Sequence, residues 1–200
     1  MGARVGDWIQ TYTGVHFYPL DPRPEDFRIE DIAHALSNLC RYTGHVSRFY
    51  SVAEHSVHVS RLCPPGWELA GLLHDAAEAY INDLSRPLKH GGGLDGYRAI
   101  EWGLDSAIAE RFTLGFPLPM CVKDIDKAMF WWESRELMMA DRAWEQWREY
   151  ADRYDRPTIY GWSPDQAKIE FLMRFKELVG ADHPFHGAIS KQEEPAKAVG

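Results

Sequence analysis

A short segment, Leu72-Leu73-His74-Asp75-Ala76-Ala77-Glu78, holds the densest group of reactive side chains in the sequence. Residues three and four positions apart share one face of a helix, so His74, Asp75 and Glu78 can converge on one point. An adjacent His-Asp pair in an apolar helix is unfavourable to bury unless both groups gain partners, and a divalent metal ion would partner both. The alternative interpretation is a hydrogen-bonded core histidine beside a carboxylate that caps a helix.

Two other segments carry matching ligands. His55 lies on the preceding expected helix, and Asp126 stands at the start of a later one. Together with His74 and Asp75 they would supply two imidazole nitrogens and two carboxylate oxygens, a set that suits one metal ion with open positions for water and substrate. His58, three residues after His55, could face the same site and indicate a second ion.

The elements that position these residues are expected to be helices, because apolar residues recur at helical spacing along most of the chain. We expect helices from Ile29, over Val52–Leu62, from Trp67 to Ala76, over Tyr97–Phe112, over Cys121–Tyr150 and from Ser163 to Gly180. The segments Asp83–Lys89 and Gly91–Gly93 are typical of loops. The last helix has the clearest start, because Ser163, Pro164 and Gln166 form a capping box with proline at the first helical position.

The two ends of the chain differ from this helical pattern. Residues 1–28 mix short β-prone runs with glycine and proline, which favours an irregular or hairpin-like arm that turns around Thr13-Gly14. Residues 181–200 lack apolar periodicity and predict a flexible tail. The sequence therefore predicts an all-α fold with one helical bundle over residues 29–180.

Composition limits the class of protein. A chain of 200 residues, 45% of them hydrophobic, suffices for one domain core. The net charge of −8 argues against binding a nucleic acid polymer or an anionic membrane surface. Because no segment approaches the run of about 18 apolar residues that a membrane span needs, and the N-terminus lacks a signal peptide, we expect a cytoplasmic location. Cys40, Cys63 and Cys121 form no CxxC pair, so we predict neither a disulfide framework nor a thiolate metal site.

Several motifs, in this order, resemble those of the HD-domain metal-dependent phosphohydrolases. They are Ser51-Val52-Ala53-Glu54-His55-Ser56, His74-Asp75-Ala76-Ala77-Glu78, Asp83-Leu84-Ser85-Arg86-Pro87-Leu88-Lys89 and Val122-Lys123-Asp124-Ile125-Asp126. Over residues 29–140 the chain is most similar to bacterial 5'-deoxynucleotidases and phage dATP triphosphohydrolases. The resemblance implies an HD-domain bundle that holds one divalent metal ion (Co, Mn, Zn, Fe, Ni or Mg) through His55, His74, Asp75 and Asp126. The Val-Lys-x-x-Asp pattern favours Asp126 over its neighbour Asp124.

The same resemblance implies roles for further residues. Glu78 would position or deprotonate the attacking water, and Asp83 would orient that network or contact the sugar. Arg41 and Lys89 would bind the phosphate of a nucleotide substrate. The resemblance also implies a homo-oligomer, either a dimer or a hexamer, in a bacterial cytoplasm or, for a phage protein, in the host cytoplasm.

These residues together predict an enzyme that hydrolyses phosphate from (2'-deoxy)nucleotides, because a bound metal ion acidifies water and neutralises charge on phosphoryl oxygens. A dNTP such as dATP would yield the deoxynucleoside and tripolyphosphate, and a dNMP would yield the deoxynucleoside and phosphate. The alternative is a non-catalytic HD protein that senses a nucleotide or a metal. Glu78 and Asp83 favour the enzyme, since a passive metal site needs no acid or base. A helical interaction protein with a coincidental His-Asp pair is a third hypothesis.

Other residues have ordinary interpretations beside the functional ones. His34 and His45 are interpreted as hydrogen-bonded or solvated rather than as substrate contacts. The tryptophans from Trp131 to Trp147 are interpreted as core or subunit-interface residues rather than as a platform for base stacking. Arg48 and Arg86 are either further phosphate-binding cations or solvated surface charges.

Overall fold

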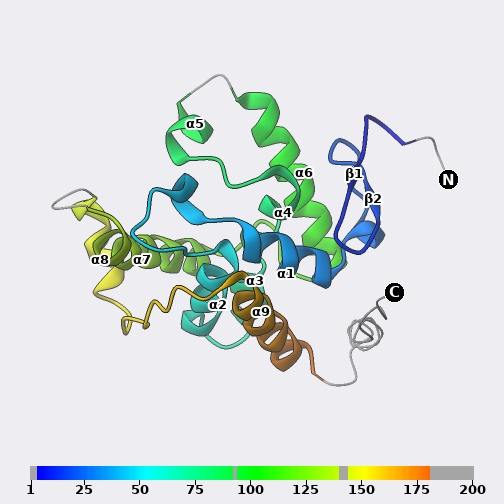
Figure 1. Cartoon of the computed structure of the whole chain (residues 1–200). Coiled ribbons are helices and arrows are strands. Elements are labelled where there is room, and N and C mark those ends of the chain that lie inside the picture. The colour runs from blue at the N-terminus through cyan, green and yellow to red at the C-terminus, as the bar shows by residue number, and fades with distance from the viewer. Residues whose placement is uncertain (1–3, 92–93, 140–143, 181–200) are drawn as a thin grey trace, which may run out of the picture.

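The structure, a computed structural model, is an α-helical bundle with a short N-terminal hairpin (Figure 1). It describes residues 4–91, 94–139 and 144–180. The strands are β1 (Ile9–Gln10) and β2 (His16–Phe17), and the 3-10 helices are η1 (Pro24–Asp26), η2 (Arg41–Gly44) and η3 (Glu145–Trp147). The α-helices are α1 (Ile29–Asn38), α2 (Val52–Leu62), α3 (Glu68–Leu72), α4 (Glu78–Ile81), α5 (Arg86–His90), α6 (Asp95–Arg111), α7 (Met120–Leu137), α8 (Arg148–Ala151) and α9 (Pro164–Val179). The all-α class with a hairpin-like arm is confirmed, and the predicted tail over residues 181–200 lies outside the described residues.

The two helices with the clearest sequence signals form where those signals place them. At the start of α2 the Ser51 side chain accepts a hydrogen bond from the Glu54 amide at 3.1 Å, and α2 spans the predicted residues. At the start of α9 the Ser163 hydroxyl accepts a hydrogen bond from the Gln166 amide at 3.3 Å. Gly180 follows α9 with a φ of 78°, a left-handed conformation that glycine adopts without strain.

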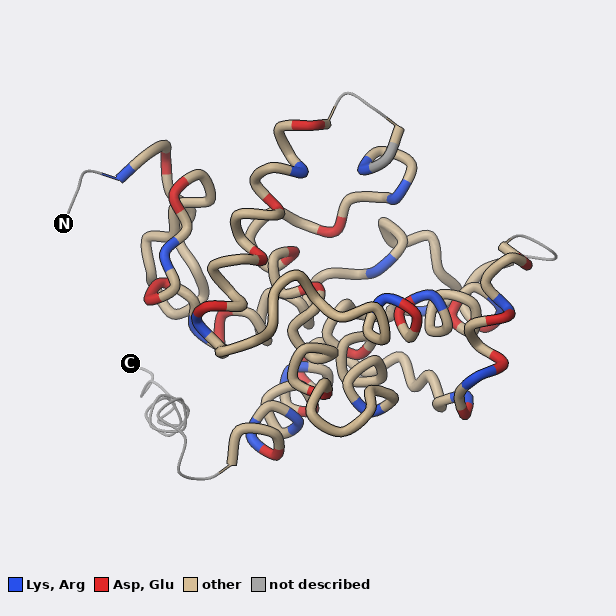
Figure 2. The backbone as a smooth tube through the Cα atoms, turned by 180° about the vertical axis from the view of Figure 1, so that it is seen from behind, with Lys and Arg blue, Asp and Glu red and all other residues tan. Residues whose placement is uncertain are grey.

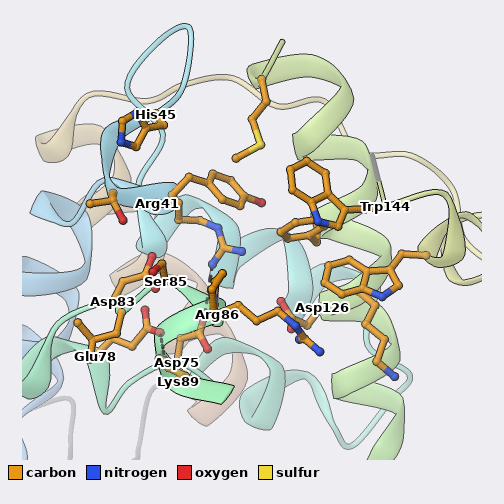
Figure 3. A pocket seen from close by; sticks show the side chains of 18 residues that line it. Arg41, His45, Asp75, Glu78, Asp83, Ser85, Arg86, Lys89, Asp126 and Trp144 are labelled. Carbon is orange, nitrogen blue, oxygen red and sulfur yellow. Dashed lines mark hydrogen bonds and ion pairs between the residues drawn. The ribbon is translucent and has the colours of Figure 1, made fainter. Parts of the chain in front are cut away.

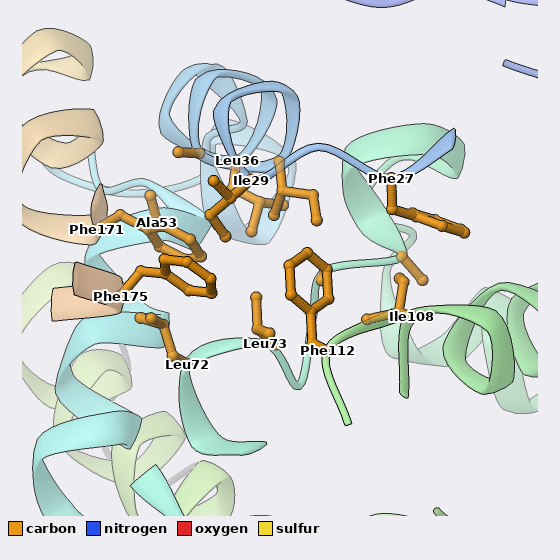
Figure 4. Packing of buried hydrophobic residues seen from close by; sticks show 14 of the residues in the cluster. Phe27, Ile29, Leu36, Ala53, Leu72, Leu73, Ile108, Phe112, Phe171 and Phe175 are labelled. Carbon is orange, nitrogen blue, oxygen red and sulfur yellow. The ribbon is translucent and has the colours of Figure 1, made fainter. Parts of the chain in front are cut away.

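Helix α2 lies at the centre of the bundle, where it contacts α1, α3, α7 and α9. Its residues from Val52 to Ser60 are all buried. One cluster of buried side chains, drawn in Figure 4, includes Leu36, Ala53, Leu72, Phe112, Phe171 and Phe175. A second cluster includes Val59, Ile125 and Met129. Because α2 is buried on all sides, its polar side chains Glu54, His55 and His58 need partners inside the protein.

Three predicted elements differ from the structure. The helix expected over residues 67–76 stops at Leu72 and resumes only at Glu78. The long helix expected over residues 121–150 ends at Leu137, whose carbonyl accepts a hydrogen bond from the Ser47 amide at 2.7 Å. The loop expected over residues 83–89 contains α5, because Pro87 fits the first turn of a helix.

The N-terminal arm is the hairpin that the sequence predicts. Strand β1 pairs antiparallel with β2, with Ile9 opposite Phe17, and the turn contains Gly14 with a φ of 85°. Phe17 is fully buried and stacks on Tyr80 of α4, with ring centroids 4.0 Å apart. The arm is therefore packed against the short helix that begins with Glu78.

Basic and acidic residues are interspersed along the chain (Figure 2). Surface pairs include Arg61 with Glu170 at 3.3 Å and Arg174 with Glu177 at 3.1 Å. Such exposed pairs add little stability, so the ion pairs buried inside the bundle are the ones that need an explanation. Within the described part of the chain, no helix combines the length and the apolar composition that crossing a membrane requires.

Candidate metal centre

Three side chains meet where α2 faces the turn between α3 and α4. They are His55, His74 and Asp75, whose ligand atoms all lie within 4.8 Å of one another. The Nε2 atoms of the two histidines are 3.2 Å apart, and Asp75 Oδ2 is 3.2 Å from His74 Nε2 and 3.8 Å from His55 Nε2. Asp126 of α7 adjoins this group, with its Oδ1 3.2 Å from His55 Nε2. The four predicted ligands are thus brought to one place, and Asp126 contacts the group through His55.

The His-Asp pair lies in a turn and not in the helix that the spacing predicts. The Gly71 carbonyl accepts a hydrogen bond from His74 Nδ1 at 2.8 Å. The following backbone bonds join residues three apart, as from the Glu78 amide to the Asp75 carbonyl at 3.0 Å. This tighter 3-10 pattern replaces the α-helical one and carries His74 and Asp75 to the side of α2.

Glycine at position 71 lets α3 pack closely against α2. A Cβ at this position would lie 2.6 Å from Cys63 Sγ and 3.1 Å from Ser60 Cα. Because Ser60 Cα is backbone, it cannot move aside as the end of a side chain could. Any larger residue would therefore push α3, and His74 with it, away from His55.

The hydrogen bonds of the two histidines determine which ring nitrogens face the group. His55 Nδ1 lies 2.6 Å from Glu133 Oε1, and His74 Nδ1 lies 2.8 Å from the Gly71 carbonyl. Since a carbonyl and an ionised carboxylate only accept, both Nδ1 atoms donate, and the two Nε2 atoms face each other. Two unprotonated Nε2 atoms at that separation would repel, so a proton or a metal ion is needed between them. Two imidazoles beside carboxylates fit a divalent transition-metal ion, with the second hydrogen bond of each ring fixing its orientation.

The surrounding charges also favour a cation. Burial alone would lower the pKa of His74, but Asp75 beside it raises this pKa to about 9. In the neighbouring helix α6, burial and the charges of Glu101 and Asp75 raise the pKa of Asp105 to about 7. Without a metal ion the site therefore holds a proton on His74 and, near pH 7, on part of the Asp105 carboxyls. A divalent ion would bind His74 by displacing its proton.

Glu133 of α7 is the residue of this site that the sequence reasoning missed. It is fully buried and accepts hydrogen bonds from Arg41 Nε at 3.2 Å, Tyr50 Oη at 2.8 Å, Tyr42 Oη and His55 Nδ1. Burial would raise the pKa of Glu133, but the charges of Arg41 and His55 hold it well below its usual range. Glu133 therefore stays ionised and orients the imidazole of His55.

Replacing Glu133 with glutamine is expected to weaken metal binding by about 10-fold to 100-fold, the usual loss when a residue behind a metal ligand is changed. The amide keeps the shape of the side chain but removes the charge that orients His55. Titration of the metal-free protein with Mn²⁺ or Zn²⁺ measures the change. Glu136→Gln is the matched control, because Glu136 lies on the same helix as Glu133 but pairs with Arg48 and Arg156 outside the site. Equal affinities in both variants would remove Glu133 from the site.

A cavity of about 670 Å³ opens beside this group (Figure 3). Its size lies within the range of roughly 300 to 1,000 Å³ that small-molecule sites occupy. Asp75, Glu78, Asp83 and Asp126 all line it. The two candidate ligand carboxylates, Asp75 and Asp126, and the predicted acid and base residues therefore face one space that can hold a small molecule.

The side of the cavity across from Glu78 and Asp83 is aromatic (Figure 3). Phe130 of α7 meets Trp144 and Trp147 edge-on, with ring centroids 5.1 and 4.2 Å apart. We call these three residues the aromatic wall. Trp144 and Trp147 line the cavity and are not core residues, while their place in a subunit interface stays a prediction.

Glu78 combines a paired oxygen with an unpaired one. Its Oε1 is 3.1 Å from Lys89 Nζ, which is also 2.9 Å from Glu101 Oε1. Its Oε2 is buried and has no hydrogen-bond partner among the described residues. Burial and the charges of Asp75 and Asp83 raise the pKa of Glu78 well above its ordinary value. This carboxyl can therefore both accept and hold a proton beside the cavity.

The two cations predicted to bind phosphate line the cavity but already take part in ion pairs. Arg41 is buried between Glu133 and Asp75, whose oxygens lie 3.2 and 3.4 Å from its nitrogens. Lys89 is held by Glu78 and by a second carboxylate on α6. The positive charge of both side chains is balanced within the protein.

Two rival ligands lie outside the group. His58 contacts Glu54 instead, with its Nε2 3.6 Å from Glu54 Oε1, and so does not point to a second ion beside His55. Asp124 pairs with Lys127 at 3.2 Å, whereas Asp126 faces the cavity. Of the two aspartates, Asp126 is the one that contacts His55 and lines the cavity, so it stays the predicted ligand.

Of the other residues with two interpretations, two lie away from the cavity and one lines it. His34 stacks on Tyr12 of the arm, with ring centroids 3.8 Å apart, and has an ordinary packing role. Arg48 pairs with Glu136 and does not belong to the cavity lining that the structure describes. His45, in contrast, lines the cavity.

Two bacterial proteins are similar to this chain. No family model matches it. The uncharacterized protein YfdR of Escherichia coli K12 is 36% identical over 171 residues, which cover 86% of this chain and 95% of YfdR. An uncharacterized protein of Rhodobacter capsulatus is 40% identical over 130 residues, which cover 60% of this chain and 66% of that protein. The chain therefore belongs to the same family as YfdR.

Proposed function

We propose that this chain is an HD-superfamily phosphohydrolase that uses one divalent metal ion to remove phosphate from 2'-deoxynucleotides. The observation that carries the proposal is the His55, His74 and Asp75 group, whose Asp75 lines the same cavity as Glu78. A carboxyl that can take up a proton beside a metal site favours a catalytic role over passive sensing. Fe, Co, Ni, Zn and Mn suit these nitrogen and oxygen ligands better than Mg, which prefers oxygen alone.

The side chains around the cavity can each contribute to such a hydrolysis. When bound, a divalent ion withdraws charge from the phosphoryl oxygens and acidifies water. Glu78 accepts the proton of the attacking water on its unpaired oxygen. A bond forms from the water oxygen to phosphorus, the bond from phosphorus to the 5' oxygen breaks, and the leaving oxygen takes up a proton. Asp83 also lines the cavity, where its carboxylate can orient a water molecule or the sugar of the substrate.

The nucleotide part of the proposal has two supports. The motif resemblance points to deoxynucleotidases and to dATP triphosphohydrolases. Independently, the aromatic wall offers flat apolar surface on which a purine or pyrimidine ring can stack. Both a nucleoside monophosphate and a triphosphate remain within the proposal, since either would place a phosphate by the metal group and a base on the wall.

Incubating metal-loaded protein with dAMP and with dATP tests the proposal. We expect deoxyadenosine to form together with phosphate from dAMP, with tripolyphosphate from dATP, or with both, and ion-exchange chromatography separates these products. Protein stripped of metal by a chelator is the control. If metal analysis confirms a bound ion and a full panel of nucleotides is left intact, a sensor role replaces the enzyme.

A further inference from the structure

Four cationic side chains line the cavity: Arg41, Arg86, Lys89 and Lys127. Arg41 is paired with Glu133 and Asp75, and Lys89 is paired with carboxylates on α4 and α6. Lys127 is 3.2 Å from an Asp124 oxygen. The charges of these three side chains are therefore already balanced by carboxylates.

Arg86 differs from the other three cations. Among the described residues no carboxylate forms an ion pair with it, and its Cζ lies 5.0 Å from the centre of the Trp147 ring. Figure 3 shows its side chain reaching into the cavity. An aromatic face attracts and orients a guanidinium but leaves the N–H donors along its edge free. Arg86 thus presents an oriented, unneutralised fork of donors to the cavity.

The charges of the lining indicate what this fork would bind. The four cations are matched by four carboxylates, Asp75, Glu78, Asp83 and Asp126. The lining is formally neutral before a metal ion enters, so a divalent ion would give it two excess positive charges, which match a dianionic phosphate. Arg86 is the lining cation without a carboxylate partner among the described residues, so its donors are the ones open to that phosphate. Planar donors in this arrangement match two oxygens of a phosphate group.

We propose that Arg86, held by Trp147, is the residue that binds the phosphate group of the substrate. This inference rests on the proposed function and goes beyond it, because it transfers to Arg86 a role that the sequence motifs imply for Arg41 and Lys89. Arg41 and Lys89 then act as positioning residues, which hold Asp75 and Glu78 in place.

Calorimetric titration of the metal-loaded protein with inorganic phosphate and with tripolyphosphate tests this role. Arg86→Ala is expected to bind both anions about 10-fold to 100-fold more weakly, as the loss of a charge-assisted hydrogen bond predicts, and to keep its metal. Arg98→Ala is the control, because it removes an exposed arginine of α6 that pairs with Asp95 outside the cavity lining. This control should bind as tightly as the unaltered protein.

A second variant examines how Arg86 is held. Trp147→Leu should weaken phosphate binding, but should add nothing to Arg86→Ala in the double variant, because the ring acts only through the guanidinium.

Equal phosphate affinity in Arg86→Ala and the unaltered protein would overturn the inference and leave the proposed hydrolysis intact. Phosphate binding that depends on Arg86 in a protein that consumes no nucleotide would overturn the hydrolysis alone. Metal-loaded protein that binds neither anion would overturn both.

Discussion

Asp75→Ala and His74→Ala proteins are expected to lose the bound metal and nucleotide hydrolysis together. Asp75 Oδ2 lies within 3.8 Å of both histidine Nε2 atoms, and His74 contacts both other members of the group. Removing either residue leaves two of these three donors together with Asp126 and removes the contacts that join the group, so we expect the ion to dissociate into water. Metal analysis after dialysis and a turnover assay on the same sample measure both losses.

Asp124→Ala provides the matched control for these ligand variants. It removes a carboxylate from α7 two residues before Asp126, but one that pairs with Lys127 and Arg153. We expect it to keep its metal and its turnover. A chelator should abolish turnover of the unaltered protein, and added metal should restore it. Full turnover by metal-free protein would contradict the assignment of the whole site.

Glu78→Gln is expected to keep the metal but to lower turnover by about 100-fold or more, as the loss of a general acid or base does. Glutamine retains an oxygen that can accept from Lys89, so the local structure should persist. It can no longer take a proton at the buried oxygen beside the cavity. Single-turnover rates with saturating dAMP or dATP measure the chemical step directly.

Glu101→Gln is the control for Glu78→Gln, because both variants remove a carboxylate that pairs with Lys89. Glu101 contacts the same lysine at 2.9 Å, yet it does not belong to the cavity lining that the structure describes. This variant should therefore keep most of its turnover. Loss of metal from Glu78→Gln would instead identify Glu78 as a ligand, and near-normal turnover would exclude it from the mechanism.

The residues of the candidate metal centre could be named from the sequence because their signals are local. The His74-Asp75 pair, His55 on a capped helix and Asp126 near a helix start are short motifs, and the resemblance of these motifs implied them as ligands without knowledge of the fold. The break in the helix before His74 could not be predicted. It depends on the Gly71 carbonyl bonding to an imidazole and on close packing against α2, and both are tertiary effects.

Glu133 was missed because its partners are distant in the chain. It stands seven residues after Asp126, on the same face of α7, which is the only signal that the sequence offers. Its role becomes visible only when Arg41, Tyr42 and Tyr50 fold over it.

The same limit applies to the predicted phosphate contacts. The motifs locate Arg41 and Lys89 near the site, but a motif carries no information on whether a cation is already neutralised. Likewise, Trp144 and Trp147 resemble core residues until the end of α7 at Leu137 is known, because only that end lets the chain return across Phe130.

The burial of α2 on every side has a consequence for motion within the site. Amide protons in the middle of such a helix exchange with solvent only when the whole bundle unfolds, whereas short surface segments open by local fluctuation. His55 therefore belongs to the slowest-exchanging part of the protein, while α5, with Arg86 and Leu88 exposed, belongs to a part that can open separately. A ligand could enter and leave past α5 while His55 keeps its place.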